Sequence, residues 1–221
     1  RSLESWRMIS KQEGLGLALS RSIILAILVM AVILFVIVPT IIWVELRLPK
    51  LRRPLEFLCL LPLAIPAIVL VVGVAPIYRW ISIHITESPI SLVGVYSILI
   101  LPYTYRSLAA SLDVLDIHTL SEAAQTLGAS VPRMLGGIIM PTLRSGILNG
   151  SFIAIALVLG EFTISNILNY KTFQVVIAQI GRTNGNVAVA VSLASITLVL
   201  VFLLLIPTSK RQKQVLDVDV A

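Results

Sequence analysis

Charged side chains are scarce in this sequence of 221 residues, where Asp, Glu, Lys and Arg together make up 13% and hydrophobic residues make up 57%. Soluble domains carry about 25% charged residues, so a water-soluble globule could not bury this much apolar surface. The apolar residues come in long runs without the periodicity of half-buried helices or strands. The composition therefore excludes an ordinary soluble domain and indicates that lipid surrounds much of the chain.

Residues that do chemistry are equally few. With one cysteine, Cys59, and two histidines, His84 and His118, the sequence has no disulfide framework and no Cys/His spacing of a metal site. It also lacks a Gly-x4-Gly-Lys-Ser/Thr nucleotide loop and any catalytic pairing of carboxylates or of Ser, His and Asp. We therefore predict that the chain is not an enzyme, does not hydrolyse ATP and holds no metal or cofactor. No basic helix interleaved with aromatic residues is present, which excludes a nucleic-acid partner.

Five stretches free of Asp, Glu, Lys and Arg have nearly the length of a membrane span: 22–44, 57–78, 88–105, 145–160 and 183–209. A helix rises about 1.5 Å per residue and the hydrocarbon core is about 30 Å thick, so about 20 residues are needed. The fourth stretch reaches that length only by continuing through Glu161 toward Tyr170. We predict an all-α membrane protein, a polytopic helical bundle with five spans. Because the chain opens with Arg1 instead of Met, we expect its native amino terminus, and one further helix, upstream.

Basic residues set the predicted orientation of these spans. Five spans place three basic segments on one side: the loop with Arg47, Lys50, Arg52 and Arg53, the segment with Arg106, Arg133 and Arg144, and the tail with Lys210, Arg211 and Lys213. These are the majority of the 17 Lys and Arg residues, so we predict that this side is cytoplasmic. Residues 1–21 are then extracytoplasmic, 22–209 form the transmembrane domain and 210–221 form a cytoplasmic tail.

The cytoplasmic segment between the third and fourth stretches contains the pattern of a short helix. Thr119 with Glu122 three residues later is a capping box, which predicts a helix that begins at Thr119. Gly128 is suited to end that helix in a left-handed conformation, and Ser130 with Pro132 suits the cap and first turn of the next one. The pattern predicts a helix of about two turns over 119–128, with a plain solvated connector as the alternative.

A longer pattern contains this helix: Glu122-Ala123-Ala124, three residues, Gly128, nine residues, Ile138, one residue, Met140 and Pro141. It resembles the EAA signature of ABC importer permeases, with Met140 where that family usually has Leu. The resemblance covers the chain from residue 19 onward and is greatest to the branch of spermidine/putrescine permeases and their relatives for ferric ion, thiosulfate, sulfate, molybdate and phosphonates. Such permeases commonly have six spans, and the missing span would precede Arg1.

The resemblance implies a type I ABC importer permease fold in the bacterial cytoplasmic (inner) membrane. It also implies a second permease subunit, homologous or identical, two cytoplasmic ATPase subunits that bind ATP and Mg, and an extracytoplasmic substrate-binding protein. The helix over 119–128 would be the coupling helix that docks on the ATPase. The residues expected to dock are Thr119, Ser121, Glu122, Ala123, Ala124, Gln125 and Gly128.

Glu161 is the only acid inside a predicted span. A carboxylate that faces lipid costs on the order of 2.5–3.5 kcal/mol on insertion scales, so it should face a cavity, a partner residue or another subunit. The stretch LVLGEFTISNILNY resembles a Gly-Glu-Phe stretch of several anion and iron permeases. We predict that Glu161, with Asn166 and Asn169, lines the translocation pathway or its outer gate. The alternative is a structural acid paired with Arg or backbone groups.

Small residues and prolines predict how the spans pack. Gly146 and Gly150, flanked by Ser145 and Ser151, should let another helix approach closely, from the same chain or from a second subunit. Five prolines lie in the apolar stretches and predict kinks: Pro39, Pro62, Pro66, Pro76 and Pro102. These kinks either surround a cavity that opens alternately to each side or are simply tolerated by neighbouring helices.

The solute is the least defined part of the prediction. A lone acid in the pathway favours a cation, and together with the branch resemblance this predicts a polyamine such as spermidine or putrescine. Ferric ion, thiosulfate or sulfate, and a phosphonate are the alternatives. An ATP-independent secondary transporter is the rival class, but a single intramembrane acid is little for ion coupling.

Overall fold

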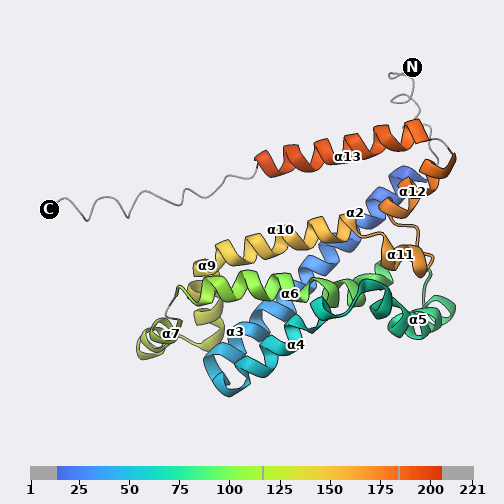
Figure 1. Cartoon of the computed structure of the whole chain (residues 1–221). Coiled ribbons are helices and arrows are strands. Elements are labelled where there is room, and N and C mark those ends of the chain that lie inside the picture. Colours follow the sequence, from blue (N-terminus) through green and yellow to red (C-terminus); the bar gives the residue numbers. More distant parts are fainter. Residues whose placement is uncertain (1–13, 116, 184, 206–221) are drawn as a thin grey trace. The chain divides into compact units, whose positions relative to one another are not determined.

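The computed structural model describes residues 14–115, 117–183 and 185–205, and these residues are helices and short connections without a strand. The chain divides into a larger unit, within Glu13–Val176, and a second unit that includes Ile177 and the residues after it. The elements of the larger unit are α2 (Leu15–Val32), η1 (Ile33–Ile37), α3 (Val38–Arg47), η2 (Pro49–Leu51), α4 (Arg52–Ala64), α5 (Ala67–His84), η3 (Pro89–Leu92), α6 (Val93–Leu112), α7 (Ile117–Thr126), α8 (Val131–Met134), η4 (Leu135–Ile139), α9 (Met140–Thr142), α10 (Arg144–Gly160) and α11 (Thr163–Ile167) (Figure 1). Helix α12 (Phe173–Thr183) joins the two units, and α13 (Gly185–Leu205) belongs to the second.

Among the described residues, four helical stretches are long and apolar enough to cross a membrane: Leu15–Arg47, Ala67–His84, Pro89–Leu112 and Arg144–Ile167. Large apolar side chains are exposed along them; Phe35 is 79% exposed and Ile83 is 68% exposed. Exposed apolar surface of this extent is expected only where lipid or another protein covers it. The predicted all-α fold with membrane-length helices is confirmed. The fifth predicted span, 183–209, falls largely on α13, and its residues 206–209 lie outside the described residues.

The second predicted span is wrong in its bounds, because the chain breaks into α4 and α5 before Pro66. Ile65, which precedes Pro66, has φ −103° and ψ 119°, an extended conformation that the next proline ring favours. Pro62 lies four residues earlier, so a continuous helix would also press the Pro66 ring against the carbonyl of Pro62. The span that results is α5, Ala67–His84, and α4 is a separate shorter helix.

Two other prolines are accommodated without a break. Pro39 follows the π-helical turn η1, and Pro141 follows the π-helical turn η4. In both cases the next residue is a threonine whose hydroxyl donates to the carbonyl four residues earlier, at 2.6 Å from Thr40 Oγ1 to Val36 O and 2.6 Å from Thr142 Oγ1 to Ile138 O. The wide turn makes room for the proline ring, and the threonine hydroxyl supplies a hydrogen bond to a backbone carbonyl. The first helical stretch therefore continues from Leu15 to Arg47.

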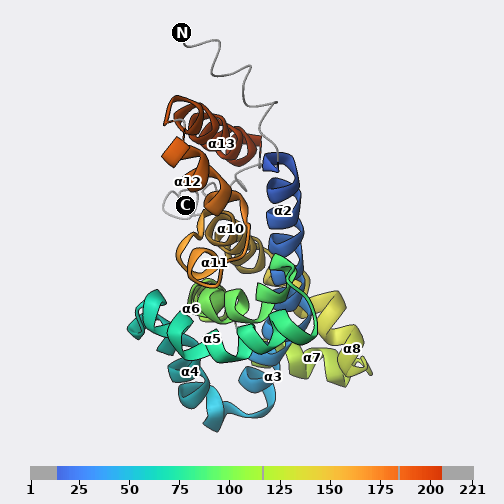
Figure 2. The same ribbon diagram turned by 90° about the vertical axis from the view of Figure 1, so that its right-hand side faces the viewer.

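The core of the larger unit lies where α6 packs against α10, with α2 and α4 on their flanks. Helices α6 and α10 run side by side in opposite directions (Figures 1 and 2). Gly146 and Gly150 of α10 make this approach possible: a Cβ at Gly146 would strike Ser111 Oγ and lie 2.9 Å from the Ser107 carbonyl oxygen. Ser107 Oγ also donates to the Gly146 carbonyl at 2.9 Å. The small residues predicted to receive a helix thus face α6 of the same chain.

Candidate functional site

Helix α7, which contains the predicted coupling helix, begins earlier than expected. It starts at Ile117, so Thr119 lies in its first turn and not at its boundary. Ile117 is 3% exposed and joins the apolar core, which accounts for the two additional residues. The helix has 10 residues, or roughly three turns instead of two.

The end of α7 follows the predicted pattern. Gly128 has a φ of 77°, the left-handed conformation expected for it. The Ala129 N–H donates to the Ala124 carbonyl at 3.0 Å, and the Gly128 N–H donates to the Gln125 carbonyl at 2.9 Å. These two bonds are those of a Schellman motif, which satisfies the last carbonyls of a helix. Ser130 is then extended before α8, although its hydroxyl makes no capping hydrogen bond.

The residues expected to dock on a partner divide between two faces of α7. Ser121 and Ala124 are buried at 6% and 3% exposure and face the chain's own core. Ser121 Oγ donates to Met134 Sδ at 3.1 Å, and Gln125 Nε2 donates to Ser121 Oγ at 2.9 Å. The exposed members are Thr119, Glu122, Ala123, Gln125 and Gly128, and the adjacent Leu127 is 88% exposed. The surface of α7 that a partner could contact therefore includes only some of the residues expected to dock.

Arg52 connects two segments that are far apart in sequence. Its Nη1 lies 2.9 Å from Glu45 Oε1, and its Nη2 lies 2.7 Å from Asp113 Oδ1. The Asp113 hydrogen bond, followed by the charge of Glu45, raises the pKa of Arg52 above its ordinary value. This bridge places the α3–α4 connection beside the end of α6. Both segments were predicted to lie on one side of the membrane, but no pattern in the sequence indicated the bridge.

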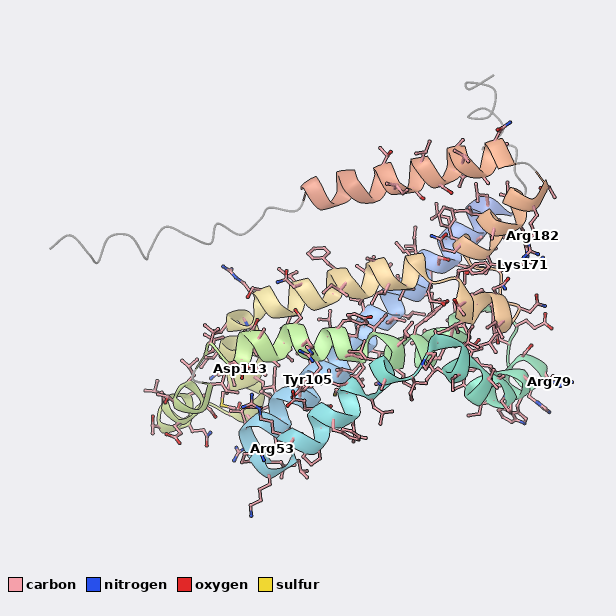
Figure 3. The ribbon with its side chains drawn as sticks, in the orientation of Figure 1. Arg53, Arg79, Tyr105, Asp113, Lys171 and Arg182 are labelled. Atoms are coloured by element: carbon pink, nitrogen blue, oxygen red, sulfur yellow. The ribbon has the colours of Figure 1, made fainter. Side chains whose placement is uncertain are left out.

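Charged residues are found at both ends of the larger unit. Arg53 and Asp113 lie at one end, close to α7, whereas Arg79 and Lys171 lie at the opposite end (Figure 3). The α7 end has the richer supply of basic residues, from Arg47 through Arg53 in the α3–α4 connection to Arg133 and Arg144. This distribution is the one used to predict a cytoplasmic location for α7.

Glu161 lies at the break between α10 and α11, where its backbone is extended. Its Oε1 accepts from the Ile164 N–H at 2.8 Å, and its Oε2 accepts from the Tyr96 hydroxyl at 2.7 Å. The Ser165 hydroxyl lies 2.6 Å from the Tyr96 hydroxyl, and both residues are fully buried. Both carboxylate oxygens are therefore occupied by groups of this chain. The geometry matches the structural alternative. The fourth predicted span does continue through Glu161, as the stretch Arg144–Ile167, but its helix is interrupted after Gly160.

The two asparagines predicted for the pathway are exposed at the end of α11. Asn169 has a φ of 60°, and it is the only non-glycine residue with positive φ in the described part of the chain. The Tyr170 N–H donates to the Ser165 carbonyl at 2.8 Å, and the Asn169 N–H donates to the Asn166 carbonyl at 3.2 Å. This is a second Schellman motif, with Asn in the position that Gly128 occupies after α7. The left-handed backbone conformation at this position therefore explains why an asparagine is found there.

The histidines and the cysteine do not belong to the groups described above. Within the described residues no group of three or more His, Cys, Asp or Glu could hold a metal ion. His84 stacks on Trp80 with ring centroids 5.0 Å apart, and its Nδ1 lies 2.9 Å from the Trp80 carbonyl. Cys59 is buried at 3% exposure. The side chain of His118 lies outside the described residues.

Fold and charge distribution together define an all-helical protein built from membrane-length helices. No protein-family model matches the chain. Over 86 residues, 39% of its length, the chain is 35% identical to the molybdenum transport system permease protein ModB of Haemophilus influenzae. The matched stretch covers 37% of the length of that relative, so the chain aligns with little more than a third of it.

Proposed function

We propose that the chain is the membrane-spanning permease subunit of an ATP-driven ABC importer. The observation that carries this proposal is α7, a short helix held at the basic end of the helical unit, with Glu122 and Ala123 exposed on its outer face. Gly128, the glycine of the EAA pattern, follows this helix in the left-handed conformation expected for it. The similarity to a transport-system permease and the four apolar helices support the same class.

The contacts of α7 suggest how motion of a partner reaches the membrane. Buried Ser121 and Ala124 join α7 to the core, and α7 also packs against α3, α8 and η4. Because α8, η4 and α9 lead into α10, a displacement of α7 is passed to a span that packs on α6. An ATPase that binds the exposed face in one nucleotide state would thereby bias the membrane helices between two arrangements. In this proposal two ATPases, a second permease and an external binding protein complete the transporter.

For the solute we propose an oxyanion, with molybdate as the first candidate. The similar relative is named for molybdenum transport, and molybdenum in neutral water is the oxyanion molybdate. The polyamine expected from the sequence rested on a lone acid in the pathway and on the branch resemblance. Glu161 instead accepts hydrogen bonds from Ile164 and Tyr96, which weakens its attraction for a cation. The comparison gives the polyamine no support.

A single-cysteine experiment tests the docking surface. The only native cysteine, Cys59, is buried, so Ala123→Cys provides one accessible thiol on α7. Glu87→Cys, in the exposed connection between α5 and η3, provides a matched thiol at the opposite end. A bifunctional thiol reagent should crosslink Ala123→Cys, but not Glu87→Cys, to an ATP-binding protein. A membrane-impermeant maleimide added to intact cells should label only Glu87→Cys. Labelling of Ala123→Cys from outside, or no crosslink to an ATP-binding protein, contradicts the proposal.

Solute uptake distinguishes the substrates. Cells that lack the chain and cells that regain it are compared for uptake of molybdate, spermidine, ferric ion, thiosulfate and an aminophosphonate. The chain should restore molybdate uptake, and depletion of ATP should abolish it. Restoration of spermidine uptake alone would reinstate the polyamine, and uptake that survives ATP depletion would indicate a secondary transporter.

A further inference from the structure

The connection between α3 and α4 presents cations that have no acidic partner in the described part of the chain. Arg47, Lys50 and Arg53 are exposed, and of the basic residues in this connection only Arg52 forms ion pairs. Arg52 is already compensated by Glu45 and Asp113, so it does not add to the available positive charge. Arg53 lies at the outer edge of this end of the larger unit (Figure 3).

Acidic residues nearby do not cancel this charge. Glu45 is committed to Arg52 at 2.9 Å, and Asp113 is committed to the same guanidinium at 2.7 Å. Glu56 lies on α4 close to Arg53 in sequence, but no ion pair joins them within the described residues. The connection therefore keeps an excess of positive charge.

Apolar side chains border the same cations. Trp43 is 44% exposed, and the Arg47 guanidinium lies over its ring at 5.9 Å from the centroid. Leu48 and Leu51 are 42% and 47% exposed. Arg47 is the last residue of the 33-residue span that begins at Leu15, so this set lies where the apolar span ends. Trp and Arg side by side at the end of a span are typical of the interface between hydrocarbon and headgroups.

We propose that Trp43, Arg47, Lys50 and Arg53, together called the elbow site, bind the phosphate of anionic phospholipid headgroups. Cations alone would equally suit an acidic protein surface, but a surface of that kind has no apolar groups to cover the exposed Trp43, Leu48 and Leu51. A lipid supplies a phosphate for the cations and acyl chains for the apolar side chains. The proposal rests on the membrane-spanning fold and is independent of the importer function.

Fluorescence quenching of Trp43 measures the lipid at this site. The sequence contains three tryptophans, so Trp6→Phe with Trp80→Phe leaves Trp43 as the only reporter. The full chain is reconstituted into vesicles of phosphatidylcholine and phosphatidylglycerol in which either one lipid or the other is brominated. Brominated phosphatidylglycerol should quench Trp43 more strongly than its share of the bilayer predicts.

Charge removal then tests whether the elbow cations cause the preference. Each Lys or Arg near an anionic surface contributes a factor of about five in binding, so Lys50→Gln with Arg53→Gln should lower the preference for phosphatidylglycerol by at least about fivefold. Arg79→Gln with Lys171→Gln, at the opposite end, is the matched control and should leave it unchanged. Raised salt should weaken the preference of the unaltered elbow site.

Four results overturn the proposal. Equal quenching by the two brominated lipids shows that no headgroup is selected. A preference that survives Lys50→Gln with Arg53→Gln shows that other groups select it. A preference abolished by inorganic phosphate at constant ionic strength identifies a site for a soluble anion. Loss of a co-purifying protein from the double variant, with lipid preference intact, assigns the cations to a protein contact.

Discussion

At the scale of single residues, Glu161 stabilises the connection between helices α10 and α11. One of its oxygens holds the first turn of α11 through the Ile164 N–H, and the other holds α6 through the Tyr96 hydroxyl. Glu161→Gln keeps one acceptor oxygen but replaces the other with an NH2 group that cannot accept. The Tyr96 hydroxyl can accept from this NH2 group and donate to Ser165 Oγ, so the change mainly replaces hydrogen bonds to a carboxylate with weaker ones to a neutral amide. This should lower the free energy of unfolding by about 1 kcal/mol. Thermal unfolding of the purified protein in detergent measures this change.

Asn166→Ala is the matched control, because Asn166 is exposed and lies on the same short helix. Its stability should stay within about 0.5 kcal/mol of the unaltered protein. Solute uptake by Glu161→Gln, normalised to the amount of folded protein, separates the two interpretations of this residue. Normal uptake leaves the structural interpretation, whereas a loss of uptake without loss of stability would place Glu161 in the pathway.

Asn169 shows why polar residues were harder to assign from sequence than apolar ones. It was predicted to line the pathway because it continues the polar character after Glu161, but its φ of 60° gives it a backbone role. The sequence alone does not distinguish an asparagine that contacts solute from one that adopts a left-handed turn. The available signal was its position just after a short helical pattern, where Asn substitutes for Gly. For Gly128 the same signal was used and gave the correct conformation.

At the scale of elements, the contact of α10 with α6 depends on one glycine more than on the other. A Cβ at Gly146 would strike Ser111 Oγ and come within 2.9 Å of the Ser107 carbonyl, whereas a Cβ at Gly150 would lie 3.6 Å from Thr104 in ordinary contact. Gly146→Ala should therefore destabilise the protein by about 1–3 kcal/mol. Gly150→Ala should be close to neutral, since it also gains helix propensity. Unfolding in detergent measures both, and equal losses would show that the two helices do not pack as described.

Helix bounds were predictable where length and composition decide them, and not where prolines do. The first, third and fourth apolar stretches identified membrane-length helices correctly, because crossing lipid requires about 20 apolar residues whatever surrounds them. Five prolines carried the same expectation of a kink, yet the chain breaks only before Pro66. The π-helical turn before Pro39 and the Thr40 hydroxyl bond depend on local geometry that a pattern of residue types does not show. Helix α7 begins earlier than predicted for a similar reason, because Ile117 is buried in the core.

At the scale of the larger unit, Arg52 joins the end of the first span to the end of α6, next to the helix proposed to receive the ATPase. Both ion pairs are short, but their exposure differs: the side chain of Glu45 is 15% exposed and that of Asp113 is 60% exposed. Water and salt screen the second pair more, although its hydrogen bond is the larger cause of the raised pKa of Arg52. The bridge therefore stabilises the unit mainly through Glu45.

Double-mutant cycles test this ordering, with Arg52→Met combined in turn with Glu45→Gln and with Asp113→Asn. Each coupling energy should be at most about 1 kcal/mol, as for other partly exposed pairs, and the Arg52–Glu45 coupling should exceed the Arg52–Asp113 coupling. Raised salt should reduce the Asp113 coupling first. Unfolding in detergent at low and high salt supplies the energies. A larger and salt-resistant coupling to Asp113 would show that the end of α6, and with it the base of α7, is held against the elbow more firmly than its exposure indicates.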